Sequence, residues 1–501
     1  MRLSLIKSLA RLHLITPLGL YTIIRCFMYE GITLMAALRF SAKYYPENTA
    51  IVSEKTKLTY RQLYHQARNL SKFLWQQYQL KEDMRVALFC RNHHVSSILL
   101  PALSRLGVKI KLINTDICES KIKEIAEKQG FKLFIYDEEF SDRIQSDILP
   151  FTCISTESIK EISAEDYHHV KLPKVKRGGD ISIFTGGSSG KYSEAARRTG
   201  VIQFLSPFIA LIERIKIQNY NSVLIALPFY HGFGLATWII SLVMGKKICI
   251  MRHFDATEAL QMILNERIEV LPVVPAILSR IWLQPNAHSM MQSVRCIISG
   301  GDRLDKQLVE HTHNILGPVC YNLYGTTEAG LLMLATPDDL DNNKETTIGR
   351  PIRGVCTEIR NISSEDIGTL WVKCSCAMLG EQDHWQATSD LVFKNNDGYY
   401  FHKGRADSMI VCGGENVFPG HVEQIINGHP SVIQSMVYAV EDPKFGNVLN
   451  AQVELKTDMH ISDKELKQWL RQRLSSPEMP HHIIFREFSL LSTGKISKQR
   501  T

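Results

Sequence analysis

The chain has 501 residues, 45% of them hydrophobic, and a formal net charge of +7. This length allows more than one domain, and the composition is that of an ordinary folded protein. A basic surplus of this size, without a ladder of basic and aromatic residues, argues against a nucleic-acid-binding protein. Eleven cysteines without paired spacing indicate reduced thiols in a cytosolic protein. Cys374 and Cys376 stand close together, but with no second ligand pair nearby they do not predict a zinc site.

Residues 1–45 form an apolar and basic segment. Leu5, Leu9 and Leu12 recur on one face of an expected helix, and Lys7 lies on the other face. The apolar run that follows is interrupted by charged residues and a proline, so it is too short to cross a bilayer. No clean cleavage site follows it, which argues against a secretory signal. We favour a peripheral segment on the inner, anionic face of the cell membrane, and packing on the protein's own body stays the alternative.

From residue 46 to residue 403 the sequence alternates helix-like and strand-like stretches. Residues 58–78 have helical periodicity, and short apolar runs typical of buried strands follow. This alternation predicts an α/β fold with a large N-terminal domain of parallel or mixed sheets covered by helices. Functional loops are then expected at the carboxyl ends of the strands. The strand-like runs are 85–90, 222–228, 246–251 and 294–300.

Beyond residue 350 the expected strands become shorter and form hairpins. Asn396, Asp397 and Gly398 supply turn chemistry for one of them. A small α+β pattern follows. We therefore expect a second, mobile domain over residues 404–501.

The stretch FTGGSSG, residues 184–190, has the composition of a phosphate-binding loop. Glycines let backbone amides close on phosphate oxygens, and serine and threonine hydroxyls add donors. It is not the Walker loop of nucleotide hydrolases, because Thr185 stands where that loop has its first glycine and Tyr192 follows Lys191. The candidate ATP-binding residues in the loop are Thr185, Gly186, Gly187, Ser188, Ser189 and Gly190.

The loop resembles that of the adenylate-forming superfamily, which includes acyl-CoA synthetases, peptide-synthetase adenylation domains and luciferases. Two positions depart from the family pattern, since Tyr192 stands for a proline and Ser193 for a lysine. The missing lysine removes a positive charge beside the pyrophosphate, which favours a weakened enzyme or compensation by Arg197 or Arg198. The family's other motifs follow in order at residues 228–234, 299–304, 321–330, 348–351, 388–391, 404–423 and 492–497.

The resemblance implies roles for residues of the ATP site. Glu328, beside Thr327 in the YGTTE turn, would hold Mg²⁺ against the ATP phosphates. Asp390 and Arg405 would reach the ribose hydroxyls, and Tyr324 would stack near the adenine. The plainer alternatives are a solvated glutamate, a turn aspartate, a boundary salt bridge and core packing. The other ATP-site residues that the resemblance implies are Gly300, Gly301, Gly325 and Thr326.

Two further residues carry the chemistry that the resemblance implies. Lys495 would place an ammonium beside the α-phosphate, where it stabilises the transition state. His231 would line the pocket of the carboxylate and the acyl-adenylate. An idle surface lysine and a core histidine are the alternatives. The small domain would rotate about Asp407, and the residues brought to the coenzyme A side would be Gly413, Gly414 and Glu415.

The resemblance, which is greatest to fatty acyl-CoA synthetases, implies an AMP-forming acid–thiol ligase that uses ATP, Mg²⁺ and coenzyme A. Since the apolar N-terminal segment is similar to theirs, we expect a medium- or long-chain fatty acid as the substrate. The motifs end at the lysine loop without a carrier domain, which favours free coenzyme A over a tethered acceptor. Two alternatives stay open. The chain loads a separate carrier protein, or it is a degenerate adenylate-binding homologue, as Ser389 in place of the usual glycine also indicates.

Overall fold

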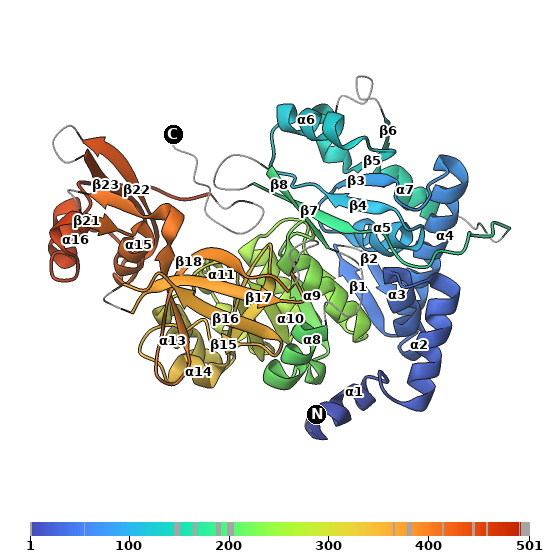
Figure 1. Ribbon diagram of the computed structural model, residues 1–501, viewed down its shortest axis with the longest axis horizontal. Helices are drawn as coiled ribbons and strands as arrows, with labels where there is room; N and C mark the ends of the chain where they lie inside the picture. The colour runs from blue at the N-terminus through green and yellow to red at the C-terminus, as the bar shows by residue number, and fades with distance from the viewer. Residues whose placement is uncertain are drawn as a thin grey trace.

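In the computed structural model, helices cover two large sheets, and three smaller sheets follow them along the chain (Figure 1). The N-terminal helices, in blue, and the last elements, in orange and red, lie on opposite sides of the molecule. This mixed α/β architecture is the one that the sequence pattern predicts. The structure describes residues 3–54, 56–144, 151–163, 167, 169–186, 192–197, 205–363, 366–377, 383–412, 415–442, 446–456, 459–489 and 491.

A six-stranded sheet has the order β6-β5-β3-β4-β7-β8 and is parallel except at β8. The strand expected at residues 85–90 is β3. The strand β8 was not expected, and it forms because the chain turns back after β7 and pairs antiparallel with it. The elements of this part are α4 (Tyr60–Tyr78), β3 (Arg85–Phe89), α5 (His94–Arg105), β4 (Lys109–Leu112), α6 (Glu119–Gln129), β5 (Leu133–Tyr136), η1 (Glu138–Arg143), β6 (Thr152–Ser155), α7 (Thr156–Ser163), β7 (Ile181–Gly186) and β8 (Tyr192–Arg197).

A nine-stranded sheet has the order β15-β14-β13-β12-β11-β9-β10-β1-β2. Its six central strands are parallel, and antiparallel strands close both edges. The strands β9, β11 and β12 are buried along their whole length, as expected for a parallel sheet with both faces covered. Its strands are β1 (Thr49–Ser53), β2 (Thr56–Thr59), β9 (Ser222–Ile225), β10 (Lys247–Ile250), β11 (Val270–Val273), β12 (Cys296–Gly300), β13 (Cys320–Thr326), β14 (Gly330–Ala335) and β15 (Arg350–Pro351).

Helices connect the parallel strands and bury their apolar faces on this sheet. α10 begins after Asp255, whose side chain accepts the N–H of Glu258 at 2.8 Å and so caps the helix. The connecting helices are α8 (Leu205–Ala210), η3 (Leu211–Ile215), η4 (Ile217–Asn219), α9 (Gly232–Val243), α10 (Ala256–Glu266), α11 (Pro275–Trp282), α12 (Ala287–Met290), α13 (Lys306–Leu316) and α14 (Pro337–Asp341).

A four-stranded antiparallel sheet leads to the last part of the chain. Its hairpin closes where the turn was expected, with the Asn395 side chain accepting the N–H of Tyr399 at 2.9 Å and Gly398 at a φ of +83°. The elements beyond it have a hydrophobic core of their own. The elements are β16 (Val355–Arg360), β17 (Gly368–Cys374), β18 (Gln386–Lys394), β19 (Tyr400–Arg405), η5 (Ala406–Ser408), β20 (Ile410–Cys412), β21 (Glu415–Val417), α15 (Pro419–Asn427), β22 (Val432–Asp442), β23 (Gly446–Leu455), α16 (Asp463–Leu470), η6 (Ser476–Glu478) and β24 (His482–Phe485).

The first helix of the N-terminal segment does not lie as we expected. Leu5 and Leu12, on the apolar face of the first helix, belong to the main hydrophobic core, so this face packs on the protein's own body and cannot contact a membrane. Among the described residues, no helix has both the length and the hydropathy that crossing a bilayer requires. The three helices of the segment are α1 (Leu3–Arg11), α2 (Pro17–Glu30) and α3 (Leu34–Tyr44).

Candidate active site

The carboxyl ends of the parallel strands carry most of the predicted site residues. β7 ends at Thr185 and Gly186, which pair with Ser193 and Tyr192 of β8. The two ends of the predicted phosphate loop therefore lie side by side. The residues of the loop that lie outside the described part of the chain are Gly187, Ser188, Ser189 and Gly190.

The end of β12 approaches its neighbours closely. A side chain at Gly300 would lie 3.2 Å from the carbonyl oxygen of Leu323 and 3.4 Å from the ring of Phe233. Gly301, with a φ of +79°, has a backbone conformation that other residues rarely adopt. At Gly325 a side chain would collide with the backbone of the facing strand β14. At these three glycines the backbone either leaves little room for a side chain or needs the left-handed conformation.

The turn between β13 and β14 presents Thr327 and Glu328 to solvent. The hydroxyl of Thr326 accepts the N–H of Ala329 at 3.0 Å and fixes the turn. The buried thiols of Cys374 and Cys376 both donate to the carbonyl oxygen of Ala329 at 3.3 Å. The carboxylate of Glu328 is exposed and forms no hydrogen bond or ion pair with any described residue.

Asp390 is the centre of a polar cluster at the end of the four-stranded sheet. Its side chain is buried, and the Tyr324 hydroxyl donates to its Oδ2 at 2.5 Å. Its Oδ1 lies 3.4 Å from Nη1 of Arg405 and 3.4 Å from Nε2 of His402. Burial and the neighbouring carboxylate raise the pKa of Tyr324 well above its ordinary value, so the hydroxyl keeps the proton that it donates. The structure thus brings together three predicted residues and adds His402, which the sequence analysis missed.

The pairing of β18 with β19 could have indicated His402. Counting outward from the turn at Asn395 and Gly398 sets His402 opposite Val392, close to Asp390. A register shift after Val392 then sets Arg405 opposite Asp390. The backbone before Asp390 also explains why the family usually has a glycine at the position of Ser389. Ser389 has a φ of +60°, in the left-handed region where glycine is preferred.

Arg405 links the cluster to the predicted hinge. Its Nε and Nη2 donate to the two carboxylate oxygens of Asp407 at 2.8 and 2.6 Å. This fork raises the pKa of Arg405 and lowers the pKa of Asp407. One guanidinium therefore contacts both the candidate ribose acceptor and the candidate hinge residue.

His231 stands at the start of α9, with its ring 5.2 Å from that of Tyr230. The strand end before it is held by Asn92, a residue that the sequence analysis missed. The buried Asn92 amide donates to the carbonyl oxygen of Leu227 at 2.8 Å and accepts the N–H of Phe229 at 2.9 Å. Because the Asn92 side chain both donates and accepts a hydrogen bond, it fixes the path of the backbone that leads to His231.

The small C-terminal part contacts the same edge of the large sheet. Arg280 of α11 donates to both carboxylate oxygens of Glu454 at 3.1 Å and to the carbonyl oxygen of Phe488 at 2.7 Å. A cavity of about 530 Å³ lies here, lined by Tyr230, Arg252 and Phe488 among others. Glu415 lies in β21, and the predicted residues Gly413, Gly414 and Lys495 lie outside the described part of the chain.

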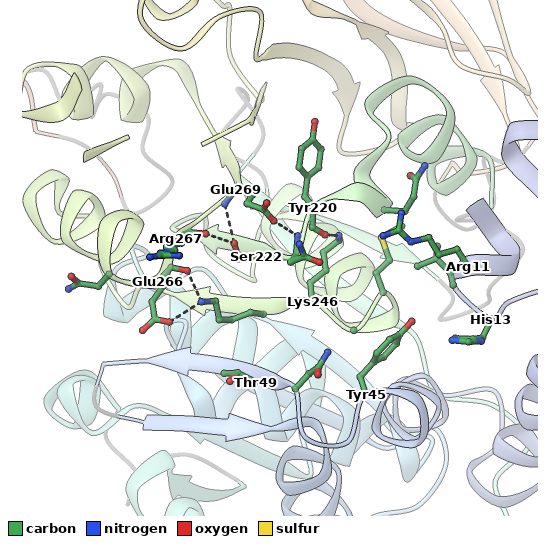
Figure 2. A pocket seen from close by; sticks show the side chains of 18 residues that line it. Arg11, His13, Tyr45, Thr49, Tyr220, Ser222, Lys246, Glu266, Arg267 and Glu269 are labelled. Carbon is green, nitrogen blue, oxygen red and sulfur yellow. Dashed lines mark hydrogen bonds and ion pairs between the residues drawn. The ribbon is translucent and has the colours of Figure 1, made fainter. Parts of the chain in front are cut away.

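A larger cavity, of about 660 Å³, lies at the opposite, amino ends of the strands (Figure 2). Both lysines that line it bond within the protein. Lys247 is 3.1 Å from a carboxylate oxygen of Glu266, and Lys246 donates to the carbonyl oxygen of Ile217 at 2.8 Å. Burial lowers the pKa of Lys246 to about 8. None of the predicted site residues lines this cavity, so it is separate from the candidate site.

Comparison with known families agrees with this arrangement. The sequence model described as AMP-binding enzyme matches residues 38–380, and the one described as AMP-binding enzyme C-terminal domain matches residues 421–495. The first match spans more than half of the chain, so the chain belongs to the AMP-binding enzyme family. This confirms the resemblance to the adenylate-forming superfamily.

Individual relatives extend the comparison. The 2-succinylbenzoate–CoA ligase of Bacillus licheniformis is 26% identical over 462 residues, covering 88% of this chain and 94% of that protein. The anthranilate CoA ligase AuaEII, solved with anthranoyl-AMP, has a TM-score of 0.82 at 18% identity and covers 93% of this chain and 95% of its own. The o-succinylbenzoate CoA synthetase (MenE) from Bacillus subtilis, solved with its acyl-adenylate, has a TM-score of 0.76 at 22% identity over 92% and 96%. These likenesses confirm the predicted fold class.

Proposed function

We propose that this chain is an ATP-dependent ligase that joins a carboxylic acid to coenzyme A through an acyl-adenylate. The cluster of Tyr324, Asp390 and Arg405 carries the proposal, because it sets a buried acceptor beside the edge where the family's motifs converge. Membership of the AMP-binding enzymes supports the nucleotide, and the activity named for the relatives supports the acceptor.

The proposed chemistry proceeds in two steps. A carboxylate does not transfer its acyl group to a thiol directly, because oxide is a very poor leaving group. Attack of the carboxylate oxygen on the α-phosphorus of ATP releases pyrophosphate, and AMP then leaves when the thiol attacks the acyl carbon. Such steps depend on positioning and charge neutralisation more than on acid–base chemistry.

Asp390 would fix the sugar of the nucleotide. A carboxylate only accepts hydrogen bonds, and the two ribose hydroxyls can both donate. Tyr324 occupies Oδ2 at 2.5 Å, while Arg405 and His402 are 3.4 Å from Oδ1. Ribose hydroxyls can replace these longer contacts without leaving the carboxylate unsatisfied.

The residues present fit Mg²⁺ at Glu328. Mg²⁺ usually takes one or two protein carboxylates and completes its shell with water and substrate phosphates. Glu328 is exposed, and the described residues contain no group of three or more His, Cys, Asp or Glu side chains that would hold a metal alone. Bound there, Mg²⁺ supplies charge neutralisation at the phosphates, while the Thr326 contact holds the turn in place.

We propose that Lys495 stabilises the negative charge that develops during adenylation. We propose that rotation of the small domain about Asp407 then prepares the site for thioester formation. Lys495→Ala should lower adenylation at least about 100-fold, since it removes a charged donor from the transition state. Thioester formation from supplied acyl-adenylate should fall less than about threefold. Equal losses in both half-reactions would contradict this assignment.

The first acid to test is 2-succinylbenzoate, because this is the acid that the name of the Bacillus licheniformis relative specifies. A medium- or long-chain fatty acid is the second candidate. The ring of Phe233 and the Cβ of Leu323, which lie beside Gly300, are compatible with it. An apolar wall accepts an aromatic ring or an alkyl chain, so the second carboxylate of 2-succinylbenzoate is the feature that separates the two acids.

Pyrophosphate release with ATP, Mg²⁺ and each acid in turn tests the proposal, followed by detection of the thioester on coenzyme A. We expect release that depends on one acid and a thioester on coenzyme A, with Lys495→Ala as the control of strongly reduced release. A thioester found only on an added carrier protein would contradict the proposal that coenzyme A is the acceptor. Absence of acid-dependent release across aromatic and aliphatic acids would favour the degenerate homologue.

A further inference from the structure

The helix α2 turns an apolar face to solvent. The large apolar side chains on this face are between 47% and 75% exposed. Among the described residues, no other helix exposes more than one large apolar side chain. A contiguous apolar surface of this kind marks an interaction site in a folded protein. We call it the α2 face, and its residues are Leu18, Leu20, Tyr21, Ile24, Met28 and Tyr29.

The opposite side of α2 is firmly anchored, so the exposed face is fixed in direction. Glu30, at the end of the helix, is buried and accepts from Arg105 Nε at 2.8 Å, Arg39 Nη1 at 2.9 Å and the Tyr64 hydroxyl at 2.8 Å. Burial alone would raise the pKa of Glu30, but the Tyr64 hydrogen bond and the Arg105 charge lower it overall. At the other end, the Thr16 hydroxyl accepts the N–H of Gly19 at 3.1 Å and caps the helix.

A strip of basic residues lies beside the C-terminal end of the α2 face. Ile32 forms a parallel bridge with Arg177, and its N–H donates to the carbonyl oxygen of Lys176 at 2.9 Å. This pairing places residues far apart in the sequence at the same edge of the molecule. The side chains of Lys174, Lys176 and Arg177 are exposed, and we call these three residues the basic strip.

Basic residues predominate around the α2 face, and the exposed Glu82 lies near the basic strip. Arg25, in the middle of the face, lies 5.8 Å from the ring centre of Tyr21 and 5.5 Å from that of Tyr29. Glu30 is the one acidic residue between positions 1 and 46, and it is buried. The neighbouring helices α3 and α4 contain no acidic residue. The surface is thus apolar at its centre and basic at its rim.

We propose that the α2 face and the basic strip dock the protein on an anionic lipid surface. Apolar side chains of a surface helix insert to the depth of the headgroup boundary, and tyrosine and arginine suit that boundary because each is apolar along its body and polar at its tip. Lysine and arginine at the rim attract anionic headgroups. A second copy of the chain fits less well, because two-fold pairing of this face would set Arg25 near its own copy without an acid to neutralise it. The proposal is independent of the proposed catalytic function, and α2 precedes residues 38–380, which match the family model.

Sedimentation with vesicles tests this docking surface. The full chain is mixed with vesicles of phosphatidylcholine alone, or with one quarter phosphatidylglycerol, at 0.1 M salt. We expect binding to the anionic vesicles and at least about a tenfold weaker partition for the triple variant Leu18→Gln, Ile24→Gln and Met28→Gln. The control changes exposed apolar side chains elsewhere, Leu264→Gln and Leu283→Gln, and should bind like the wild type.

A second variant isolates the electrostatic contribution. Lys174→Gln with Lys176→Gln and Arg177→Gln should weaken binding to anionic vesicles at least about tenfold and remove most of its salt dependence. Absence of wild-type binding to either vesicle, or unchanged binding by the α2-face variant, would overturn the proposal. A dimer in light scattering that the α2-face variant abolishes, without vesicle binding, would assign the face to a second copy. If the triple variant unfolds at the same temperature as the wild type, a folding defect is excluded as the cause. If the triple variant does not fold, the single variant Ile24→Gln takes its place in the binding assay.

Discussion

The two lysines of the amino-end cavity and the two carboxylates of the candidate site differ in how far their bonding is completed within the protein. At the amino end, Lys247 is paired with Glu266, and Lys246 donates to backbone carbonyl oxygens, although this end holds the larger cavity. At the carboxyl end, Glu328 bonds to no described residue, and Asp390 has two of its contacts at 3.4 Å. The comparison shows that the candidate site is identified by carboxylates that can still accept hydrogen bonds or a metal ion from a ligand. The volume of a cavity does not identify it.

The largest expected effect sharpens this comparison directly. Asp390→Asn should raise the Kd of AMP about 10- to 100-fold, because each hydrogen bond to a charged group contributes about 1.5–3 kcal/mol. The matched change at the amino end, Glu266→Gln, should leave that Kd within about twofold and lower the denaturation midpoint instead. Calorimetric titration with AMP and urea unfolding measure the two quantities. Similar Kd values for the two variants would break the comparison.

The next effect concerns the metal. Glu328→Gln should raise the Mg²⁺ concentration needed for half-maximal pyrophosphate release at least about tenfold, since an amide is a weaker ligand for a hard cation. Glu345, which is exposed and paired with Lys403 at 2.7 Å, provides the control Glu345→Gln with no expected change. A magnesium titration of both variants measures this. An equal shift in the two would remove Glu328 from the metal site.

At the amino end the expected effect is on stability and depends on pH. Below pH 8, Lys246 carries its proton in both the folded and the unfolded state. Between pH 8 and 10.5 the unfolded chain still holds the proton while the folded chain has released it, so the free energy of unfolding rises with pH. Relative to Lys246→Met, the wild type should gain about 2 kcal/mol between pH 8 and pH 10. Urea unfolding at the two pH values measures the gain, and parallel pH profiles would show that Lys246 stays charged.

The smallest effect is at Ser389. Ser389→Gly should raise the free energy of unfolding by about 0.5 kcal/mol, because glycine relieves the left-handed backbone at a φ of +60° and loses part of that gain to chain entropy. The same change at Ser120, in the helix α6, should lower it by about 0.5 kcal/mol. Guanidinium unfolding compares the two variants. A loss at both positions would mean that Ser389 makes contacts that outweigh its backbone strain.

The fold class and the grouping of Tyr324, Asp390 and Arg405 were predictable from the sequence. Strands of β-branched and aliphatic residues alternate with amphipathic helices, which favours a parallel sheet covered by helices. Tyr324 lies where a parallel strand ends, and the hairpin of β18 and β19 pairs Asp390 with Arg405. The family motifs assigned all three residues to one nucleotide site, but the contact of Tyr324 with Asp390 was not expected. His402 and Asn92 were not expected, since each acts through a pairing register or a long-range contact that no local pattern carries.

The orientation of the N-terminal helices was not predictable. α1 and α2 both combine apolar and basic residues, and the pattern of one helix does not say whether its apolar side faces the protein or the solvent. The structure buries Leu5 of α1 and exposes Met28 of α2. The orientation of α2 depends on the buried ion cluster of Glu30, which joins α2 to partners on the helices α3, α4 and α5. The prediction of a membrane segment thus stays a proposal, and its contact surface moves from α1 to α2.

The position of Arg405 has a consequence for how variants of this protein are interpreted. Its guanidinium contacts Asp390 and Asp407 at once. If these carboxylates have the roles proposed for them, replacing Arg405 disturbs sugar binding and the pivot together. A steady-state rate measured for such a variant will mix both defects. Rapid-mixing kinetics can measure adenylation and thioester formation separately. The loss of rate in each half-reaction can then be assigned to the contact with Asp390 or to the contact with Asp407.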